Sequence, residues 1–181
     1  MKDSDNKTKC YHGGDSFNSI GFDLKNLVNR HKIINADVLD AWFAPSPSII
    51  SELKSQMEWI IKTAPPTHSE GVIQAIAHYR DIPEDAVLTG PGSSFLIYLA
   101  LTNWLTPKSK VLLIDPIYGE YPHICQNVIG CQIDYYSLTR EDFFKINAED
   151  LAYKINHSHY DLVILVNPNT PTGQFFPNDK L

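Results

Sequence analysis

Short runs of consecutive apolar residues alternate along this chain with segments whose apolar residues recur at helical spacing. The apolar runs predict strands of a buried sheet at 86–89, 111–114 and 162–166, with a further strand at 131–136. Helical periodicity predicts helices at 48–63, 69–80, 93–105, 119–128 and 151–156. Strands that alternate with helices predict an α/β fold with a mainly parallel sheet and right-handed crossovers.

The pattern also predicts how deeply some of these elements are buried. The 111–114 run has no polar position, which is typical of a parallel strand covered on both faces. The 93–105 helix is apolar nearly all round, so we expect it to be buried on most sides. Ser48 is expected to cap the helix that follows it. Residues 1–20 are polar and contain glycine, and are predicted to form a mobile arm.

The charge balance argues against nucleic acid as the main partner. The chain has 21 acidic and 15 basic residues and a net charge of −6, whereas a phosphate backbone attracts clustered Lys and Arg. Apolar residues make up 43% of the sequence, but no apolar run approaches the ~20 residues of a membrane span. The polar N-terminus has no signal-peptide pattern, and Cys10, Cys125 and Cys131 lack metal-site spacing. We therefore expect a cytoplasmic protein with reduced thiols and no membrane partner.

Three of the predicted strands end in loops of unusual composition, and the carboxyl ends of parallel strands cluster in space. The first loop is Gly90-Pro91-Gly92-Ser93-Ser94. Gly92 permits close backbone approach, and the N-terminus of the following helix offers N–H donors to an anion. This pattern indicates either a phosphate site or an ordinary strand–helix turn with a serine cap. A nucleotide-binding domain has less support, because the loop lacks a P-loop lysine and Phe95 replaces the third glycine of a dinucleotide fingerprint.

The other two loops contribute an aromatic ring and short polar groups. Tyr118, within 115–121, could stack on a flat ligand above the first loop or simply pack against the protein. The loop 167–173, with the sequence NPNTPTG, contains two prolines and a glycine that fix its backbone. It is either a rigid connection or a loop whose polar side chains contact a ligand.

Other familiar catalytic patterns are missing from the sequence. The seven histidines have no metal-binding spacing, so no metal site is predicted. No G-x-S-x-G segment supports an esterase nucleophile. His12 and Gly13 belong either to a disordered tail or to a ligand contact.

Taken together and in this order, the loops resemble those of fold-type-I pyridoxal-phosphate (PLP) enzymes. The resemblance is to class I/II aminotransferases, in the branch of histidinol-phosphate aminotransferase and threonine-phosphate decarboxylase. The segment 167–173 is similar to the family's N-P-x-N-P-T-G, 90–94 to its phosphate-binding G-x-G-S turn, and 115–121 to its P-x-Y element. The implied fold has three layers. Residues 48–181 would form the first, incomplete part of the PLP-binding large domain, and residues 1–47 an N-terminal arm and linker.

The resemblance implies a cofactor role for particular residues. They are Gly92, Ser93, Ser94, Tyr118, Asn169 and Thr170. The residues of the first loop would hold the cofactor phosphate and Tyr118 would cover the ring. Thr170 stands where the family has asparagine, so either its hydroxyl or Asn169 would reach the ring hydroxyl. His12 and Gly13 would lie near the substrate.

The implied activity is the transfer of an amino group between an amino acid, phosphorylated or imidazole-bearing, and a 2-oxo acid by a homodimer. The family's Schiff-base lysine has no counterpart in residues 1–181. We therefore assign no catalytic residue, expect this segment alone to be inactive, and expect strand 86–89 to lack its partners. Two alternatives remain open: an amino-acid-phosphate decarboxylase on the same scaffold, and a non-catalytic truncated protein that binds a phosphate-bearing ligand.

Overall fold

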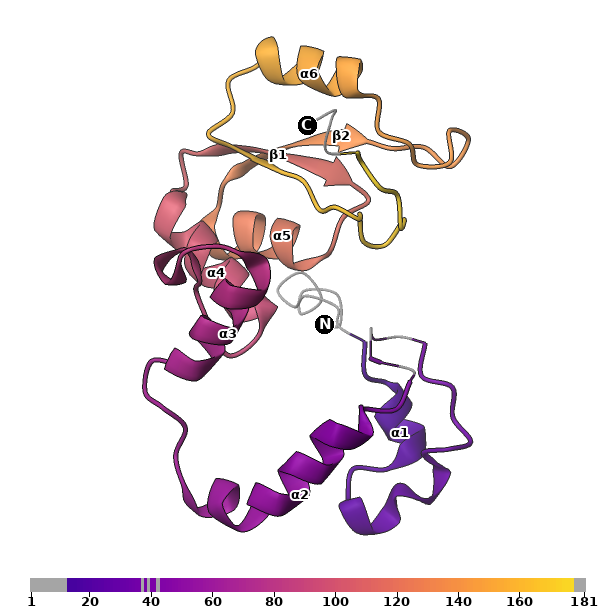
Figure 1. Cartoon of the computed structure of the whole chain (residues 1–181). Coiled ribbons are helices and arrows are strands. Elements are labelled where there is room, and N and C mark those ends of the chain that lie inside the picture. Colours follow the sequence, from indigo (N-terminus) through magenta and orange to yellow (C-terminus); the bar gives the residue numbers. More distant parts are fainter. Residues whose placement is uncertain (1–12, 37, 39, 42, 178–181) are drawn as a thin grey trace. The chain divides into compact units, whose positions relative to one another are not determined.

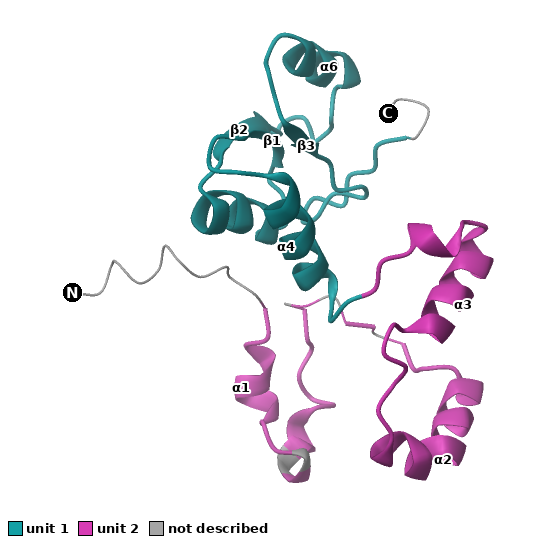
Figure 2. Ribbon diagram, turned by 90° about the vertical axis from the view of Figure 1, so that its left-hand side faces the viewer, with its two compact units in different colours: residues 1–11, 90–181 teal, residues 12–89 magenta. Residues whose placement is uncertain are grey.

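The computed structural model describes residues 13–36, 38, 40–41 and 43–177. Contacts divide the chain into two compact units, Gly90–Leu181 forming most of one and His12–Thr89 the other. Figure 2 shows them in teal and magenta. All three of the strand-end loops that the sequence singles out belong to the first unit. No described helix is both long enough and apolar enough to cross a membrane.

The first unit is built on a parallel sheet of three strands. β1 (Lys110–Asp115) lies in the middle, between β2 (Gln132–Ser137) and β3 (Leu162–Ile164). Both neighbours run parallel to β1. The register pairs Val111 of β1 with Leu162 of β3. The predicted parallel α/β sheet is therefore confirmed.

Helices cover both faces of this sheet (Figure 1). They are α4 (Ser93–Trp104), α5 (Glu120–Pro122), the π-helical segment η4 (His123–Ile129) and α6 (Ala148–Asn156). In Figure 1, α6 lies on one side of β1 and β2, and α4 and α5 lie on the other. This arrangement is the three-layer order that the sequence predicts.

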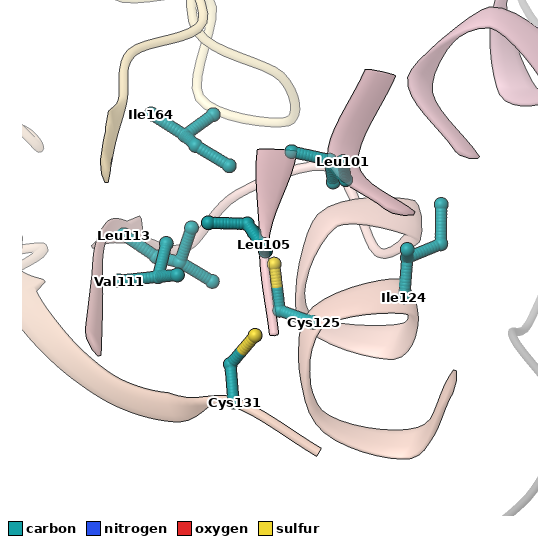
Figure 3. Packing of buried hydrophobic residues seen from close by; sticks show 8 residues of the cluster. All are labelled: Leu101, Leu105, Val111, Leu113, Ile124, Cys125, Cys131 and Ile164. Carbon is teal, nitrogen blue, oxygen red and sulfur yellow. The ribbon is translucent and has the colours of Figure 1, made fainter. Parts of the chain in front are cut away.

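Alternate residues of β1 enter two separate hydrophobic clusters, as expected from the two-residue period of a strand. Val111 and Leu113 pack with Leu101 of α4 and with Ile124 and Cys125 of η4, and Figure 3 shows this cluster. The second cluster, on the opposite face, joins Leu112 and Ile114 of β1 to Leu138 and to Leu151 of α6. All four apolar residues of β1 are at most 1% exposed, so the predicted two-sided burial is confirmed.

Local sequence explains where two of these helices begin or end. The Asn147 side chain accepts hydrogen bonds from the backbone N–H groups of Glu149 and Asp150 and so caps α6. The negative charges of Glu149 and Asp150, in the first turn of α6, also interact favourably with the positive end of the helix dipole. The η4 segment ends at Ile129 and is followed by Gly130, whose φ of 85° is in the left-handed region that favours glycine.

The second unit is helical in its described part. It contains α1 (Ser16–Ile20), η2 (Leu24–Asn29), α2 (Pro47–Lys62), α3 (Glu70–Arg80) and the short 3₁₀ helix η3 (Glu84–Ala86). Within the segment that the sequence predicts to be an arm, Ser16–Ile20 form helix α1; the predicted mobility stays a prediction. Helix α2 begins at Pro47, so Ser46 and not Ser48 is its N-cap; proline favours the first helical position because its missing N–H would have no partner there.

Two further sequence predictions are wrong in an informative way. Residues 86–89 form no strand: η3 ends at Ala86 and the chain continues without ladder pairing. An apolar run becomes a strand only if a neighbouring strand accepts its hydrogen bonds, and the three described strands pair only with one another. Helix α4 is apolar on nearly all sides but buries only Leu101, while Phe95 remains 46% exposed. No described element packs over its outer face in sufficient area to bury it.

Candidate active site at the strand ends

The carboxyl ends of β1 and β3 open into the two loops that the sequence identifies. β1 ends at Asp115 and leads into 115–121, while β3 ends at Ile164 and leads into 167–173. Because the strands are parallel neighbours, both loops leave the same edge of the sheet. Ligands of open α/β sheets bind at this edge.

The turn 90–94 presents the N-terminus of α4. Gly92 has a φ of 98°, a backbone conformation that residues other than glycine rarely adopt. Nothing lies within 4 Å of the position that a Cβ atom would take there. The amide of Leu96 donates to the Gly92 carbonyl at 3.3 Å, whereas amides of the first helical turn have no intrahelical acceptor. Ser93 is exposed and Ser94 is half-buried. The turn therefore offers backbone N–H donors, two hydroxyls and a favourable helix dipole to an anion.

A side-chain contact joins this turn to the loop that follows β1. The Ser94 hydroxyl and the Tyr118 phenol lie 3.4 Å apart. The Tyr118 ring packs edge-to-face on Tyr121, with centroids 6.2 Å apart and an interplanar angle of 81°, which is a favourable aromatic geometry. Burial raises the pKa of the Tyr121 phenol, and Tyr118 adds to the shift, so Tyr121 remains neutral. Tyr118 is thus held on one side by Ser94 and on the other by an uncharged ring.

A second contact joins the loop after β1 to the loop after β3. Asn169 is 3% exposed, and its side-chain amide donates to the Pro116 carbonyl at 3.0 Å and to the Thr172 hydroxyl at 2.9 Å. Its own backbone N–H donates to the Gln174 carbonyl, and its carbonyl accepts from the Gly173 amide, both at 2.7 Å. Asn169 therefore closes its own turn and anchors it to a loop 53 positions earlier in the chain.

Asn167 stabilises the base of the same turn. Its side-chain amide donates to the Phe176 carbonyl at 2.7 Å, and its side-chain oxygen accepts from the Phe176 amide at 2.9 Å. Paired bonds of this kind reproduce the pattern of two hydrogen-bonded strand residues. The 167–176 segment is consequently closed at its base by Asn167 and in its middle by Asn169.

The structure brings together most, but not all, of the residues that the sequence proposes. Ser94 contacts Tyr118, and Asn169 binds the Tyr118 loop through Pro116. Thr170 follows Asn169 directly and is half-buried, which places it beside this junction. The predicted ligand roles of these residues stay predictions.

The two residues predicted to contact substrate are not among those that the structure brings together. His12 lies outside the described residues. Gly13 belongs to the second unit, whose placement relative to the strand-end loops is not determined. Their role in substrate binding therefore stays a prediction as well.

Sequence reasoning missed the two groups that bind the Asn169 side chain. They are the Pro116 carbonyl and the Thr172 hydroxyl. Thr172 carries a usable signal, since a threonine within a loop rich in proline and glycine commonly hydrogen-bonds nearby backbone or side-chain groups. The Pro116 carbonyl has no such signal, because every residue carries a carbonyl and only the fold selects this one.

The sequence profile of the family described as "Aminotransferase class I and II" matches residues 35–181. The chain belongs to the class I and II aminotransferase family. A curated relative is histidinol-phosphate aminotransferase 1 of Hydrogenovibrio crunogenus, which is 30% identical over 145 residues. The match covers 80% of this chain and 38% of the relative, so the chain spans about two fifths of that aminotransferase.

Solved structures of lower sequence identity share the fold of this chain. Cystalysin from Treponema denticola, in a structure that contains a pyridoxal 5′-phosphate cofactor, superposes with a TM-score of 0.61 at 20% identity. That match covers 79% of this chain and 38% of cystalysin. A decarboxylase from Sulfurospirillum multivorans superposes with a TM-score of 0.56 at 20% identity, over 73% of this chain and 35% of that one. At these identities the structural likeness shows a shared aminotransferase-type fold.

Proposed function

We propose that this chain supplies part of the cofactor cup of a PLP-dependent aminotransferase. The whole protein would move an amino group between an amino acid, phosphorylated or imidazole-bearing, and a 2-oxo acid. Membership of the aminotransferase family and the relationship to a histidinol-phosphate aminotransferase support this proposal. The observation that carries it is the Ser94–Tyr118 contact at 3.4 Å, because it joins an anion-binding turn to an aromatic ring.

The donors and the aromatic group at the strand ends fit a phosphorylated pyridine. The first turn of α4 presents N–H groups and the hydroxyls of Ser93 and Ser94, which suit a phosphate dianion. Gly92 adds no side chain that would block it. Tyr118 is half-buried beside this turn, where its ring can cover a flat ligand.

Each of these residues has a defined task in the proposal. Ser93 and Ser94 bind the phosphate, and Tyr118 restricts the ring to one plane and excludes water from one of its faces. Thr170 donates its hydroxyl to the ring hydroxyl, because both side-chain N–H groups of Asn169 already bind protein acceptors. When bound, PLP supplies an electron sink for charge that develops on the substrate.

The same proposal includes the molecular setting of the enzyme. We propose a cytoplasmic homodimer that takes an amino acid and a 2-oxo acid, with residues 1–47 as arm and linker and 48–181 as the first part of the large domain. His12 and Gly13 would contact substrate. The absence of basic clusters from a chain with a net charge of −6 is consistent with small-molecule partners.

Cofactor binding by the full-length protein tests the proposal. Ser94→Ala should weaken PLP binding by about 10- to 150-fold, since a hydrogen bond to a charged group contributes about 1.5–3 kcal/mol. Ser137→Ala is the matched control, because Ser137 is an exposed serine at the end of the neighbouring strand β2. Titration of the apoprotein, followed by the absorbance of the bound cofactor, gives both affinities.

The outcomes separate the candidate functions. Release of an amino group to a 2-oxo acid supports the aminotransferase, and release of carbon dioxide in its place would identify the decarboxylase. Binding without either reaction would indicate a non-catalytic ligand-binding protein. Failure of the unsubstituted protein to bind PLP would refute the proposal.

A further inference from the structure

Both side-chain N–H groups of Asn169 bind acceptors of the protein itself. Its amide nitrogen lies 3.0 Å from the Pro116 carbonyl and 2.9 Å from the Thr172 hydroxyl. This orientation is the only one that suits the site, because a carbonyl oxygen accepts and cannot donate. The opposite rotation would place two oxygens against each other at Pro116.

This bond connects two short segments that carry the proposed ligand groups. Pro116 lies two residues before Tyr118, and Asn169 lies immediately before Thr170. The hydrogen bond from the Asn169 amide to the Pro116 carbonyl directly joins 115–121 to 167–173. The Asn169 side-chain amide therefore helps to set the relative position of Tyr118 and Thr170.

The side-chain oxygen of Asn169 does not stabilise the fold. The Asn169 side-chain oxygen is buried and has no hydrogen-bond partner in the described part of the chain. A buried acceptor without a donor destabilises the folded state. A leucine, which has a similarly branched side chain, would avoid that cost but could not donate to the Pro116 carbonyl. An asparagine at this position is accordingly better explained by the geometry that its amide imposes than by packing.

We propose that Asn169 is a positioning residue, which holds the 115–121 loop against the 167–173 loop so that Tyr118 and Thr170 contact the same ligand. The identity of that ligand as PLP rests on the proposed function. Asn169 itself need not contact the ligand, and acts through the Pro116 carbonyl. The proposal thus replaces a direct contact between Asn169 and the ring hydroxyl with an indirect one.

The substitution Asn169→Leu in the full-length protein tests this inference. The variant keeps a branched side chain with the same number of heavy atoms, although a larger one, and removes both donors and the unpaired acceptor. We expect some loss of thermal stability from the lost hydrogen bonds, at least fivefold faster hydrogen exchange of the 117–121 amides in the cofactor-free protein, and about tenfold weaker PLP binding. Exchange of the β1 amides 111–114 should not change, which controls for global unfolding.

Two further variants separate positioning from a structural role. Thr172→Val removes one acceptor and leaves the Pro116 bond, so it should accelerate exchange at 117–121 less than Asn169→Leu does. Burial at this 3% exposed position should raise the pKa of an introduced carboxyl group. Asn169→Asp cannot donate to Pro116 while ionised but can when protonated, so its loss of affinity relative to the unsubstituted protein should diminish as the pH falls from 8 to 5.5. Because an ionised carboxylate is costly to bury at any packed position, exchange at 117–121 is compared with exchange at 111–114 at each pH, and only a positioning residue should change the first without the second. The aspartate variant also provides the decisive measurement if the leucine variant does not fold.

Results that would overturn the inference are equally specific. Unchanged exchange and unchanged affinity in Asn169→Leu would refute it, and so would an affinity of Asn169→Asp that is independent of pH. If the unsubstituted protein binds no PLP, the proposed function fails on its own. The exchange measurement on the cofactor-free protein still decides whether Asn169 positions the Tyr118 loop.

Discussion

At the scale of single residues, burial has a clear chemical consequence for Cys125. Its side chain is fully buried against β1, and Figure 3 shows its sulfur near that of Cys131. Burial, with a smaller contribution from Cys131, raises the pKa of the Cys125 thiol from 9.0 to about 11. The thiolate, which is the reactive form, is therefore scarce at physiological pH.

Alkylation of Cys125 in the native protein should be slow for this reason. At pH 8 the shift lowers the thiolate fraction about 100-fold, from about 10% to about 0.1%, before any steric protection is counted. Mass spectrometry of the Cys125 peptide after iodoacetamide treatment, with and without urea, measures the protection. Rapid labelling without urea would show that the thiol is accessible and that the cluster around it opens readily.

The same shift makes folding depend on pH in the alkaline range. The folded state holds the Cys125 proton more tightly than the unfolded state does, so the contribution to stability is fully present below the unfolded pKa and declines as the pH rises toward about 11. Replacing Cys125 with alanine should flatten the decline in the urea midpoint between pH 8 and pH 10. The variant will also lose stability at every pH because it leaves a small cavity.

Sequence and structure agree unevenly at this scale. Tyr118 and Ser94 could be predicted because an aromatic after a strand and a serine at a helix N-terminus have recognisable local patterns. The role of Asn169 could not, because its partner is a backbone carbonyl 53 residues away. A long-range contact of this kind depends on the pairing of β1 with β3, which no local pattern specifies.

At the scale of elements, a polar cluster connects β2, α6 and the segment before β3. The Tyr160 hydroxyl donates to one oxygen of Asp134 at 2.5 Å, and the Lys154 ammonium lies 3.3 Å from the other. The hydrogen bond from Tyr160 is the main cause that lowers the pKa of Asp134, and Lys154 contributes further. The carboxylate thus joins three elements that are separate in sequence.

Removing the Tyr160 hydroxyl should weaken this connection in a pH-dependent way. Tyr160→Phe is expected to lower the free energy of unfolding by about 1 kcal/mol at pH 7, a modest value because the cluster is partly exposed to solvent. A lowered pKa means that the Asp134 contribution is present above the unfolded pKa of about 3.9 and is lost as the pH falls through the lower folded value.

Chemical denaturation of both proteins at pH 7 and at pH 3 measures this effect. The difference between them should shrink at the lower pH. Tyr153→Phe is the matched control, since Tyr153 lies on α6 and is 64% exposed. An equal difference at both pH values would show that Tyr160 acts through packing and not through the Asp134 carboxylate.

The elements themselves were predictable where the chain supplies both sides of a contact. The strands at β1, β2 and β3 and the helices α4 and α6 lie within a few residues of their expected bounds. The 86–89 run and the outer face of α4 were predicted from hydrophobicity alone, and both expectations required neighbours. Apolar character shows that a segment is suited to burial, but burial itself requires a second surface.

At the scale of the whole molecule, the clearest case of an apolar segment that lacks a second surface is the uncovered face of α4. Three of its apolar side chains, Phe95, Tyr98 and Leu99, are between 43% and 46% exposed. Leu101, on the opposite side of the helix from Leu99, is 4% exposed and packs on β1. Contiguous exposed apolar surface commonly causes association. We therefore expect residues 1–181, expressed alone, to self-associate as their concentration rises.

Two substitutions to the same residue type separate association from stability, because they differ only in the side of α4 that they change. Leu99→Gln removes exposed apolar surface and should shift the sedimentation distribution toward the monomer, with little change in the urea midpoint. Leu101→Gln places an amide in the core and should lower the free energy of unfolding by about 2–5 kcal/mol, without reducing association of the chains that remain folded. If Leu99→Gln destabilises the chain as much as Leu101→Gln does, then the outer face of α4 is covered in solution. The helix would then be buried on most sides after all, as its composition indicates.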